Sequence, residues 1–254
     1  LVDFQLFRES VFSGMKTNRA YDKLRAAEIM ELFLKEKKYP LSDREEAFQI
    51  WTELTHFGKR HQQLKDLGPG YLSLFGESGR YDQLEAEFAY FRFYTESFFS
   101  KITDLSQLEK IVTRLSLFPG SRRTYSLALD RLGRVYFDHN RYQEALEKLQ
   151  QANQIFIQNN HLLVASSNLT VQGVVYDAME DYIASAQAYQ HSNELLNQLD
   201  NKPFGTISAN AYNLGLLYLD RLGDPERALP FFAEALENDR LDGGEDNFYL
   251  GDDY

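Results

Sequence analysis

Three stretches of the chain share a glycine, an aromatic residue and a small residue at matching positions. The stretches are LGRVYFDHNRYQEALEKLQQA (132–152), QGVVYDAMEDYIASAQAYQHS (172–192) and LGLLYLDRLGDPERALPFFAEA (214–235). Their glycines, Gly133, Gly173 and Gly215, are 40 and 42 residues apart. A fixed period in this range indicates a stacked helical repeat, because each unit must bury its apolar face against a neighbour.

Each copy reads as a helical hairpin in which the shared residues have packing roles. The glycine lets two helices approach closely, and the tyrosine three residues later fills the space beside it. A small residue on the second helix completes the contact, and a larger residue four positions later lies on the same helical face. The small residues are Ala145, Ser185 and Ala228, and the larger ones are Leu149, Tyr189 and Phe232.

This pattern resembles the tetratricopeptide repeat (TPR) over residues 121–239. The period exceeds the usual length of about 34 residues, Gln172 replaces a common leucine, and the third turn carries one extra residue. Such long repeats resemble those of kinesin light chains, of peptide-pheromone receptors of Gram-positive bacteria, and of bacterial sensor kinases and transcription regulators. The resemblance implies an all-α fold, a right-handed α-α superhelix.

The rest of the chain is more divergent. We divide it into hairpins at 1–120 that continue the solenoid, three TPR-like repeats at 121–239, and an acidic tail at 240–254. The segments LGPG (67–70) and LFPGS (117–121) predict breaks between helices, with helices on both sides of the first break at 42–65 and 69–78. Neither break is long enough for a flexible interdomain linker.

Two aromatic segments allow more than one interpretation. FAYFRFYTESFF (88–99) is apolar nearly all round, which predicts a central buried helix; the alternative is a partner or dimer interface. The tail could anchor on a groove of this chain, dock on a neighbouring molecule, or form the first turns of a fourth repeat. The anchoring residues would be Phe248, Tyr249, Leu250 and Tyr254.

The charge is concentrated in the second half of the chain. Of the net −11, residues 1–120 contribute 17 Lys/Arg against 18 Asp/Glu, and residues 121–254 contribute 10 against 20. The acidic half would repel a phosphate backbone, so we expect no direct nucleic-acid contact from it, whereas a basic or amphipathic peptide is acceptable. No run approaches ~18 apolar residues, so we expect no membrane insertion.

The residues of the chain do not point to catalysis. Phosphate-binding loops, dinucleotide-binding glycines, His-Glu-x-x-His and Gly-x-Ser-x-Gly do not occur. With no cysteine there are no disulfides or thiolate sites, but this absence does not decide the compartment. Of cytosol and periplasm we slightly favour the cytosol. His56 and His61 have a poor spacing for one metal, and we expect surface or turn positions for them. The pair Glu45 and Glu46 is expected on a solvated face. We predict no enzyme, no cofactor and no metal.

The binding surface follows from the resemblance. The first helix of each repeat lines the concave face of such an array, through its second, fifth, ninth and twelfth positions. The predicted contact residues are Leu127, Asp130, Arg134, Phe137, Thr170, Asp177, Tyr212 and Leu216, and Ser167, Val174, Ala209 and Leu219 share these positions. Packing against the next repeat is the alternative role for each. The Lys/Asn clamp that binds acidic chaperone tails is absent, so such a tail is not expected as ligand.

These features predict a protein- or peptide-binding TPR domain. We expect the sensing or interaction region of a larger bacterial regulatory protein, with a homodimer as one option; Leu1 in place of a methionine predicts a fragment or processed form. The alternative is a constitutive assembly scaffold, or an envelope-associated TPR protein, without a ligand switch. A regulator resembling the response-regulator phosphatases is a third option, for which no residue can be nominated.

Overall fold

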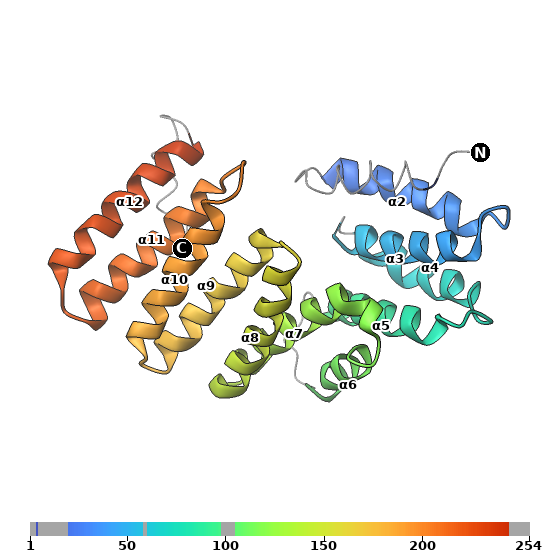
Figure 1. Ribbon diagram of the computed structural model, residues 1–254, viewed down its shortest axis with the longest axis horizontal. Coiled ribbons are helices and arrows are strands. Elements are labelled where there is room, and N and C mark those ends of the chain that lie inside the picture. The colour runs from blue at the N-terminus through green and yellow to red at the C-terminus, as the bar shows by residue number, and fades with distance from the viewer. Residues whose placement is uncertain (1–3, 5–19, 58–59, 98–104, 244–254) are drawn as a thin grey trace. The chain divides into compact units, whose positions relative to one another are not determined.

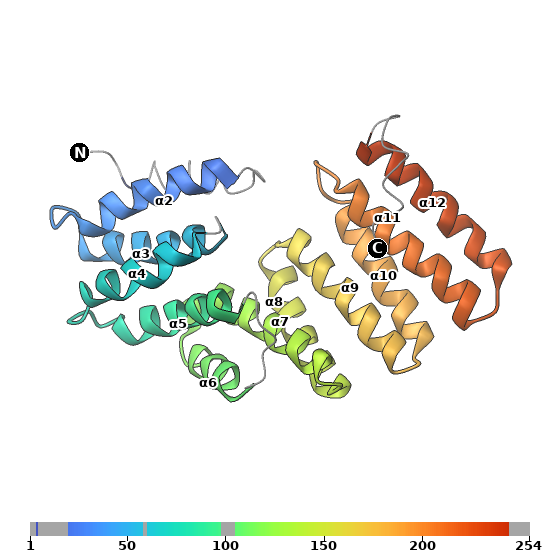
Figure 2. The same cartoon turned by 180° about the vertical axis from the view of Figure 1, so that it is seen from behind.

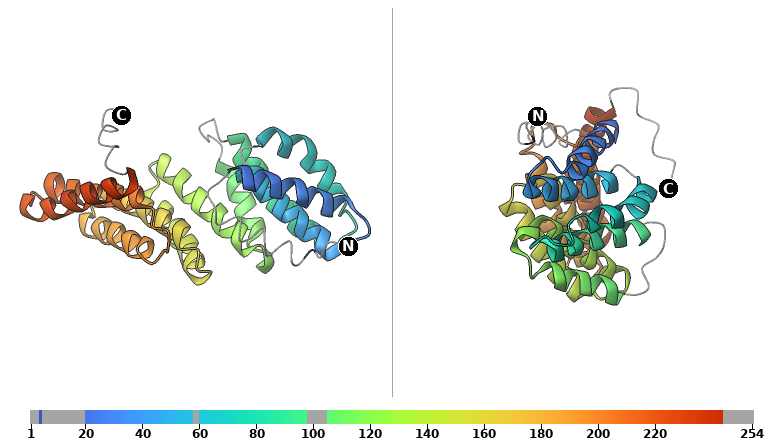
Figure 3. Two further views of the ribbon diagram at one scale, coloured as in Figure 1. Left: turned by 90° about the horizontal axis from the view of Figure 1, so that it is seen from above. Right: turned by 90° about the vertical axis from the view of Figure 1, so that its right-hand side faces the viewer.

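All regular secondary structure in the described part of the chain is helical (Figure 1). The computed structural model describes residues 4, 20–57, 60–97 and 105–243. Its α-helices are α2 (Ala20–Lys35), α3 (Leu41–Phe57), α4 (His61–Ser73), α5 (Tyr81–Ser97), α6 (Leu105–Leu115), α7 (Arg122–Asp138), α8 (Tyr142–Gln158), α9 (Leu162–Ala178), α10 (Tyr182–Leu196), α11 (Phe204–Leu216) and α12 (Pro225–Gly243). Within these residues there is no strand, which confirms the predicted all-α class (Figure 3).

The chain forms two compact units, residues 1–128 and 129–254, and α7 crosses the boundary between them. In the first unit α2 packs on α3, and α3, α4, α5 and α6 contact one another in succession. In the second unit α9 pairs with α10 and α11 with α12, while α9 also packs on α8 and α11 on α10 (Figure 2). The division into 1–120, 121–239 and 240–254 by repeat type remains a prediction.

The repeat glycines lie where two helices come into contact. A Cβ atom on Gly133 would lie 2.7 Å from Leu149 Cγ and 3.0 Å from the Ala145 carbonyl oxygen. Real Cβ atoms do not approach other atoms so closely, so only glycine allows α7 and α8 this separation. The packing role predicted for this residue is confirmed.

The same contact recurs in the next two copies. A Cβ atom on Gly173 would lie 2.9 Å from Tyr189 Cε1, and one on Gly215 would lie 2.5 Å from Phe232 Cε1. In each case the ring fills the space that a side chain would take. The residues predicted to complete the contact are buried, namely Ala145, Ser185 and Ala228.

The turn inside each hairpin has one left-handed residue, two positions before the second helix. These residues are Asn140 (φ 59°), Glu180 (φ 61°) and Gly223 (φ 64°). In the first copy the Arg141 amide donates to the Tyr136 carbonyl at 2.9 Å, and in the third copy the Asp224 amide donates to the Tyr218 carbonyl at 2.8 Å. The second of these bonds spans one residue more. A π-helical turn, η2 (Leu217–Arg221), accommodates the extra residue seen in the sequence.

The expected break at 67–70 is wrong, because α4 runs through it and ends at Ser73. A Cβ atom on Gly68 would lie 2.4 Å from the ring of Phe88, so this glycine serves helix contact and not a turn. Pro69 removes one helical hydrogen bond, but its side chain is exposed, so water can satisfy the freed carbonyl. The predicted helices 42–65 and 69–78 are therefore replaced by α3 and α4.

Two further expectations, the break at 117–121 and the buried central helix, agree with the structure. The break at 117–121 is confirmed by a 3₁₀ turn, η1 (Pro119–Ser121), between α6 and α7. Helix α5 is buried on several sides, through Phe88, Tyr90, Phe91 and Phe93, which supports the central-helix interpretation. Helix α12 continues to Gly243. The proposed anchors of the tail, and Phe98 and Phe99 of the aromatic segment, lie outside the described residues.

Leucine at Gly133 should destabilise the protein, because its side chain meets Leu149 and the fixed Ala145 carbonyl. We expect a loss of about 3 kcal/mol in the free energy of unfolding, at the upper end of the cost of overpacking. Gly70→Leu is the matched control, since a Cβ atom on this helical glycine meets nothing within 4 Å. Urea unfolding followed by circular dichroism should show the loss only for Gly133→Leu, and equal effects at both sites would contradict the packing role.

Candidate functional site

Two of the predicted contact residues are used inside the fold of the second unit. Arg134 Nε donates to Asp130 Oδ2 at 2.7 Å, and Asn168 Nδ2 donates to Asp130 Oδ1 at 2.7 Å. A further contact joins Arg134 to the Ser167 hydroxyl at 3.4 Å. Both carboxylate oxygens of Asp130 thus have internal donors, and this carboxylate links α7 to α9.

The next copy repeats this link with different residues. Thr170 Oγ1 donates to Asn210 Oδ1 at 2.9 Å, and Asn210 Nδ2 donates to Ser192 Oγ at 2.9 Å and Asn193 Oδ1 at 2.8 Å. The two links are equivalent when positions are counted with the repeat glycine as the eighth residue of each first helix. In both, the residue at the fifth position of one first helix is hydrogen-bonded to an asparagine at the third position of the first helix of the following repeat. The side chain at the fifth position therefore links α7 to α9 in one copy and α9 to α11 in the next. Sequence reasoning missed the asparagines, although their shared position before the repeat glycine was a signal.

Other predicted residues remain open to solvent. Tyr212, at the fifth position of the third copy, is 51% exposed, with its ring centroid 5.7 Å from that of Phe232. Val174 and Leu219, at the ninth and twelfth positions, are also exposed. With the exposed Ala209, these three side chains form the exposed apolar part of the predicted contact positions, which we call the first-helix face. Leu127, Phe137 and Leu216 are half-buried.

A pocket of about 230 Å³ lies between α9, α10, α11 and η2 in the second unit. Its lining residues are Asp177, Tyr189, Asn213, Leu216, Leu217, Asp220 and Arg221. The structure thus brings together two predicted residues, Asp177 and Leu216, and Asp177 accepts a hydrogen bond from Arg221 Nε at 3.1 Å. Burial, followed by the Asp177 charge, raises the pKa of Tyr189 to about 12, so this phenol stays protonated.

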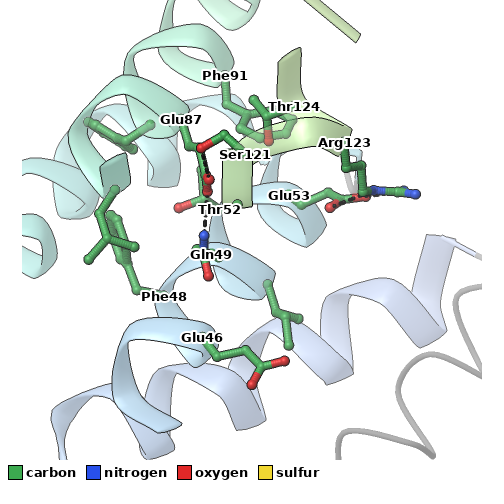
Figure 4. A pocket seen from close by; sticks show the side chains of 14 residues that line it. Glu46, Phe48, Gln49, Thr52, Glu53, Glu87, Phe91, Ser121, Arg123 and Thr124 are labelled. Atoms are coloured by element: carbon green, nitrogen blue, oxygen red, sulfur yellow. Dashed lines mark hydrogen bonds and ion pairs between the residues drawn. The ribbon is translucent and has the colours of Figure 1, made fainter. Parts of the chain in front are cut away.

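The first unit contains a second pocket, of about 160 Å³, which the sequence did not predict (Figure 4). At its centre the buried Glu87 carboxylate accepts hydrogen bonds from Gln49 Nε2 at 2.6 Å, Gln83 Nε2 at 3.0 Å and the Ser121 hydroxyl. Three donors compensate for taking this carboxylate out of water. The i, i+4 spacing of Gln83 and Glu87 was the available signal.

Elsewhere in this pocket, side chains also bond to one another. Arg123 Nε contacts both oxygens of Glu53, at 3.0 and 3.2 Å, and the two side chains lie together in Figure 4. Phe48, Phe88 and Phe91 form the apolar wall. Because Glu87 is bound by neutral donors and Glu53 pairs with Arg123, these groups serve structural cohesion more than chemistry. Among the described residues no group of three or more His, Cys, Asp or Glu side chains could hold a metal ion.

Two expectations about surface residues are wrong. Glu45 is buried, where it accepts a hydrogen bond from the Ser78 hydroxyl and pairs with Arg80 at 3.4 Å. His56 is buried as well, with Nδ1 3.0 Å from Thr95 Oγ1 and its ring among those of Phe91 and Tyr94. His56 follows buried residues of α3 by one and two helical turns, so it lies on their inward face.

The comparisons with known proteins agree with this architecture. Residues 210–240 match the family model of the tetratricopeptide repeat. In fold the chain is similar to BtubC (BKLC) from P. vanneervenii, at 13% identity and a TM-score of 0.62, covering 89% of this chain and 91% of that one. It is also similar to nearly identical TPR-like repeats ascribed to a kinesin light chain of Podosopora anserina, at 12% identity and a TM-score of 0.56, covering 78% and 95%. A comparison with curated protein sequences gives no match.

The chain therefore has the fold of TPR-like solenoids, and one segment of it, residues 210–240, is similar to the tetratricopeptide repeat. Domains of this class generally serve protein interaction and are usually not catalytic. None of the described helices is long and apolar enough to cross a membrane.

Acidification should destabilise the first unit through His56. Burial, and then the neighbouring His61, lowers the pKa of His56 from 6.5 to about 4, so the unfolded state binds the proton more tightly. The free energy of unfolding should fall by about 1.4 kcal/mol per pH unit as the pH drops from 6.5 towards 4. In urea titrations at stepped pH, His56→Gln should remove this slope relative to wild type, whereas the exposed-site control His191→Gln should keep it.

Alanine at Asn210 should weaken the second unit. The substitution removes one of the partners of Thr170 and leaves the buried polar atoms of Ser192 and Asn193 short of hydrogen bonds, at about 3 kcal/mol in total. Asn160→Ala, at an exposed left-handed turn residue, is the control and should cost about 1 kcal/mol. If thermal unfolding showed the same small loss for both variants, the hydrogen-bonded link would not set the helix spacing.

Proposed function

We propose that the second unit binds a peptide segment of a protein partner on the first-helix face of α9 and α11. The observation that carries this proposal is Tyr212, a large side chain that stays 51% exposed at a position used for internal bonding in the two earlier copies. Val174 and Leu219 extend the apolar surface. The pocket that Asp177 and Leu216 line offers a polar end to it.

The chemistry of the surface favours a basic or amphipathic ligand. Residues 129–254 contain 8 Lys/Arg against 20 Asp/Glu. In the pocket, Asp177 and Asp220 face a single guanidinium, that of Arg221. An amphipathic segment could place apolar side chains on Tyr212 and Leu219 and a donor group in the pocket. Tyrosine is among the residues that contribute most when such interfaces form.

The regulatory part of the proposal is that ligand binding shifts a conformational equilibrium in a larger bacterial regulatory protein. A constitutive scaffold is the alternative, and one observation favours it: the Thr170–Asn210 bond holds α9 and α11 at a fixed spacing. Hydrogen exchange with and without ligand separates the two. Protection changes beyond the contact residues would support sensing, and changes confined to them would support scaffolding.

The binding surface can be tested with an array of basic amphipathic 15-residue peptides, with the tightest binder carried into calorimetry. Tyr212→Ala should raise its Kd by about 30-fold, equivalent to about 2 kcal/mol. Ile183→Ala removes a side chain of similar apolar character that is exposed on α10, and should change Kd less than 2-fold. An unchanged Kd for Tyr212→Ala would remove the groove assignment.

A further inference from the structure

Helix α12 exposes leucines at positions that are buried in the two earlier copies. Leu229 is 67% exposed, whereas the equivalent residues Leu146 and Ala186 are 4% and 6% exposed. Leu236 is 44% exposed, while the equivalent Asn153 and Asn193 are buried. In the earlier copies the first helix of the next repeat covers this side: α9 packs on α8 and α11 on α10.

A hydrogen bond shows directly that these positions face the next helix. Asn193 Nδ2 on α10 donates to the Ile207 carbonyl on α11 at 3.3 Å. At the equivalent place on α12 stands Leu236, which cannot make such a bond. The side of α12 that corresponds to the covered side of α8 and α10 is therefore more apolar, because Leu236 stands where those helices carry asparagine.

The exposed residues on this side form a regular stripe along α12. Its members are Glu226, Leu229, Ala233, Leu236 and Arg240, spaced by three and four residues in alternation. This is the spacing of a helix seam that packs against another helix. We call these five residues the end stripe.

The residue types of the end stripe are arranged symmetrically about Ala233, but the two charged residues at its ends have opposite signs. Reading outward from Ala233, each direction meets a leucine and then a charged residue. The charge is negative at the N-terminal end, from Glu226, and positive at the C-terminal end, from Arg240. Two such helices in antiparallel orientation place each Glu226 opposite an Arg240 and the two alanines at the crossing point. A parallel pair would place like charges together.

We propose that a second copy of this chain covers the end stripe, through an antiparallel α12–α12 contact about a twofold axis at Ala233. The same surface serves both partners, as a twofold interface requires. Alanine at the crossing lets the helices approach closely, and the leucines on either side bury their exposed area.

The Arg240 side chain has no close ion pair within the described part of the chain that would compete with this contact. Arg240 pairs only loosely with Glu237, at 3.9 Å, and both side chains are more than half exposed. Exchanging this solvated contact for Glu226 of the second copy costs little. One helix pair buries less than the roughly 1,600 Å² of a standard interface, so the dimer should dissociate on dilution in the micromolar range. This proposal is independent of peptide binding by the first-helix face.

Sedimentation velocity of the full chain tests the contact by its concentration dependence. The wild type should shift from monomer to dimer between about 1 and 300 μM, as expected for a small interface. Leu229→Glu with Leu236→Glu should raise the dimer dissociation constant at least 10-fold. Ile183→Glu adds a charge at an equally exposed leucine-sized site on α10 and should leave it unchanged. A monomer throughout, or a dimer insensitive to the double change, would overturn the proposal.

Charge exchange tests the orientation. Glu226→Arg and Arg240→Glu should each weaken self-association, because each puts like charges opposite one another across an antiparallel pair. Mixing the two single variants should produce a heterodimer at least 10-fold tighter than either homodimer, since all cross-contacts are then between opposite charges. Absence of preferential heterodimer formation would overturn the antiparallel arrangement.

The absence of cysteine from the chain allows a direct geometric test. Ala233→Cys should form an intermolecular disulfide on mild oxidation, because the two side chains meet at the crossing, whereas Glu234→Cys, one position around the helix, should not. Equal cross-linking at both sites would overturn the contact. If removal of residues 244–254 were needed before any dimer formed, the end stripe would be covered by the chain's own tail, which would also overturn it.

Discussion

The close contact of two helices at a glycine is the constraint on which each repeat depends. At Gly133 the missing side chain lets Leu149 and the Ala145 carbonyl approach the backbone of α7, and the rings at Gly173 and Gly215 use the same space. This contact determines how far apart the two helices of a hairpin lie, so the rest of the packing must follow from it. The same relation at Gly68 and Phe88 extends it to the first unit, where the sequence shows no clear repeat.

A second set of interactions connects one hairpin to the next. The bonds from Asp130 to Asn168 and from Thr170 to Asn210 occupy equivalent positions with different chemical groups. Buried polar groups are costly unless they are paired, so these links favour one register of stacking over others. At the same position of the third copy, Tyr212 is 51% exposed. Among the described helices two apolar surfaces are exposed, the face around Tyr212 and the end stripe on α12.

Features that depend on contacts close in sequence were predicted correctly, whereas features that depend on contacts distant in sequence were not. Hairpins, the repeat glycines and the turn before each second helix depend on contacts close in sequence, and the sequence predicted them. The role of Gly68, by contrast, depends on Phe88, which lies on the following helix, so its Leu-Gly-Pro-Gly context was mistaken for a break. His56 and Glu45 were misplaced for the same reason, since their burial comes from α5 and from the Ser78–Arg80 turn, which no local pattern reveals.

For this protein the sequence alone determined an all-α repeat of the TPR type, because a period near 40 residues with a fixed glycine leaves few other ways to bury the apolar faces. It also determined an acidic second half, and the resemblance predicted a set of residues for the first-helix face. Only the tertiary structure decided which of those residues are free for a partner. Asp130 and Thr170 bond to asparagines about 40 residues further along the chain, which no local sequence pattern reveals, whereas Tyr212 is exposed to solvent.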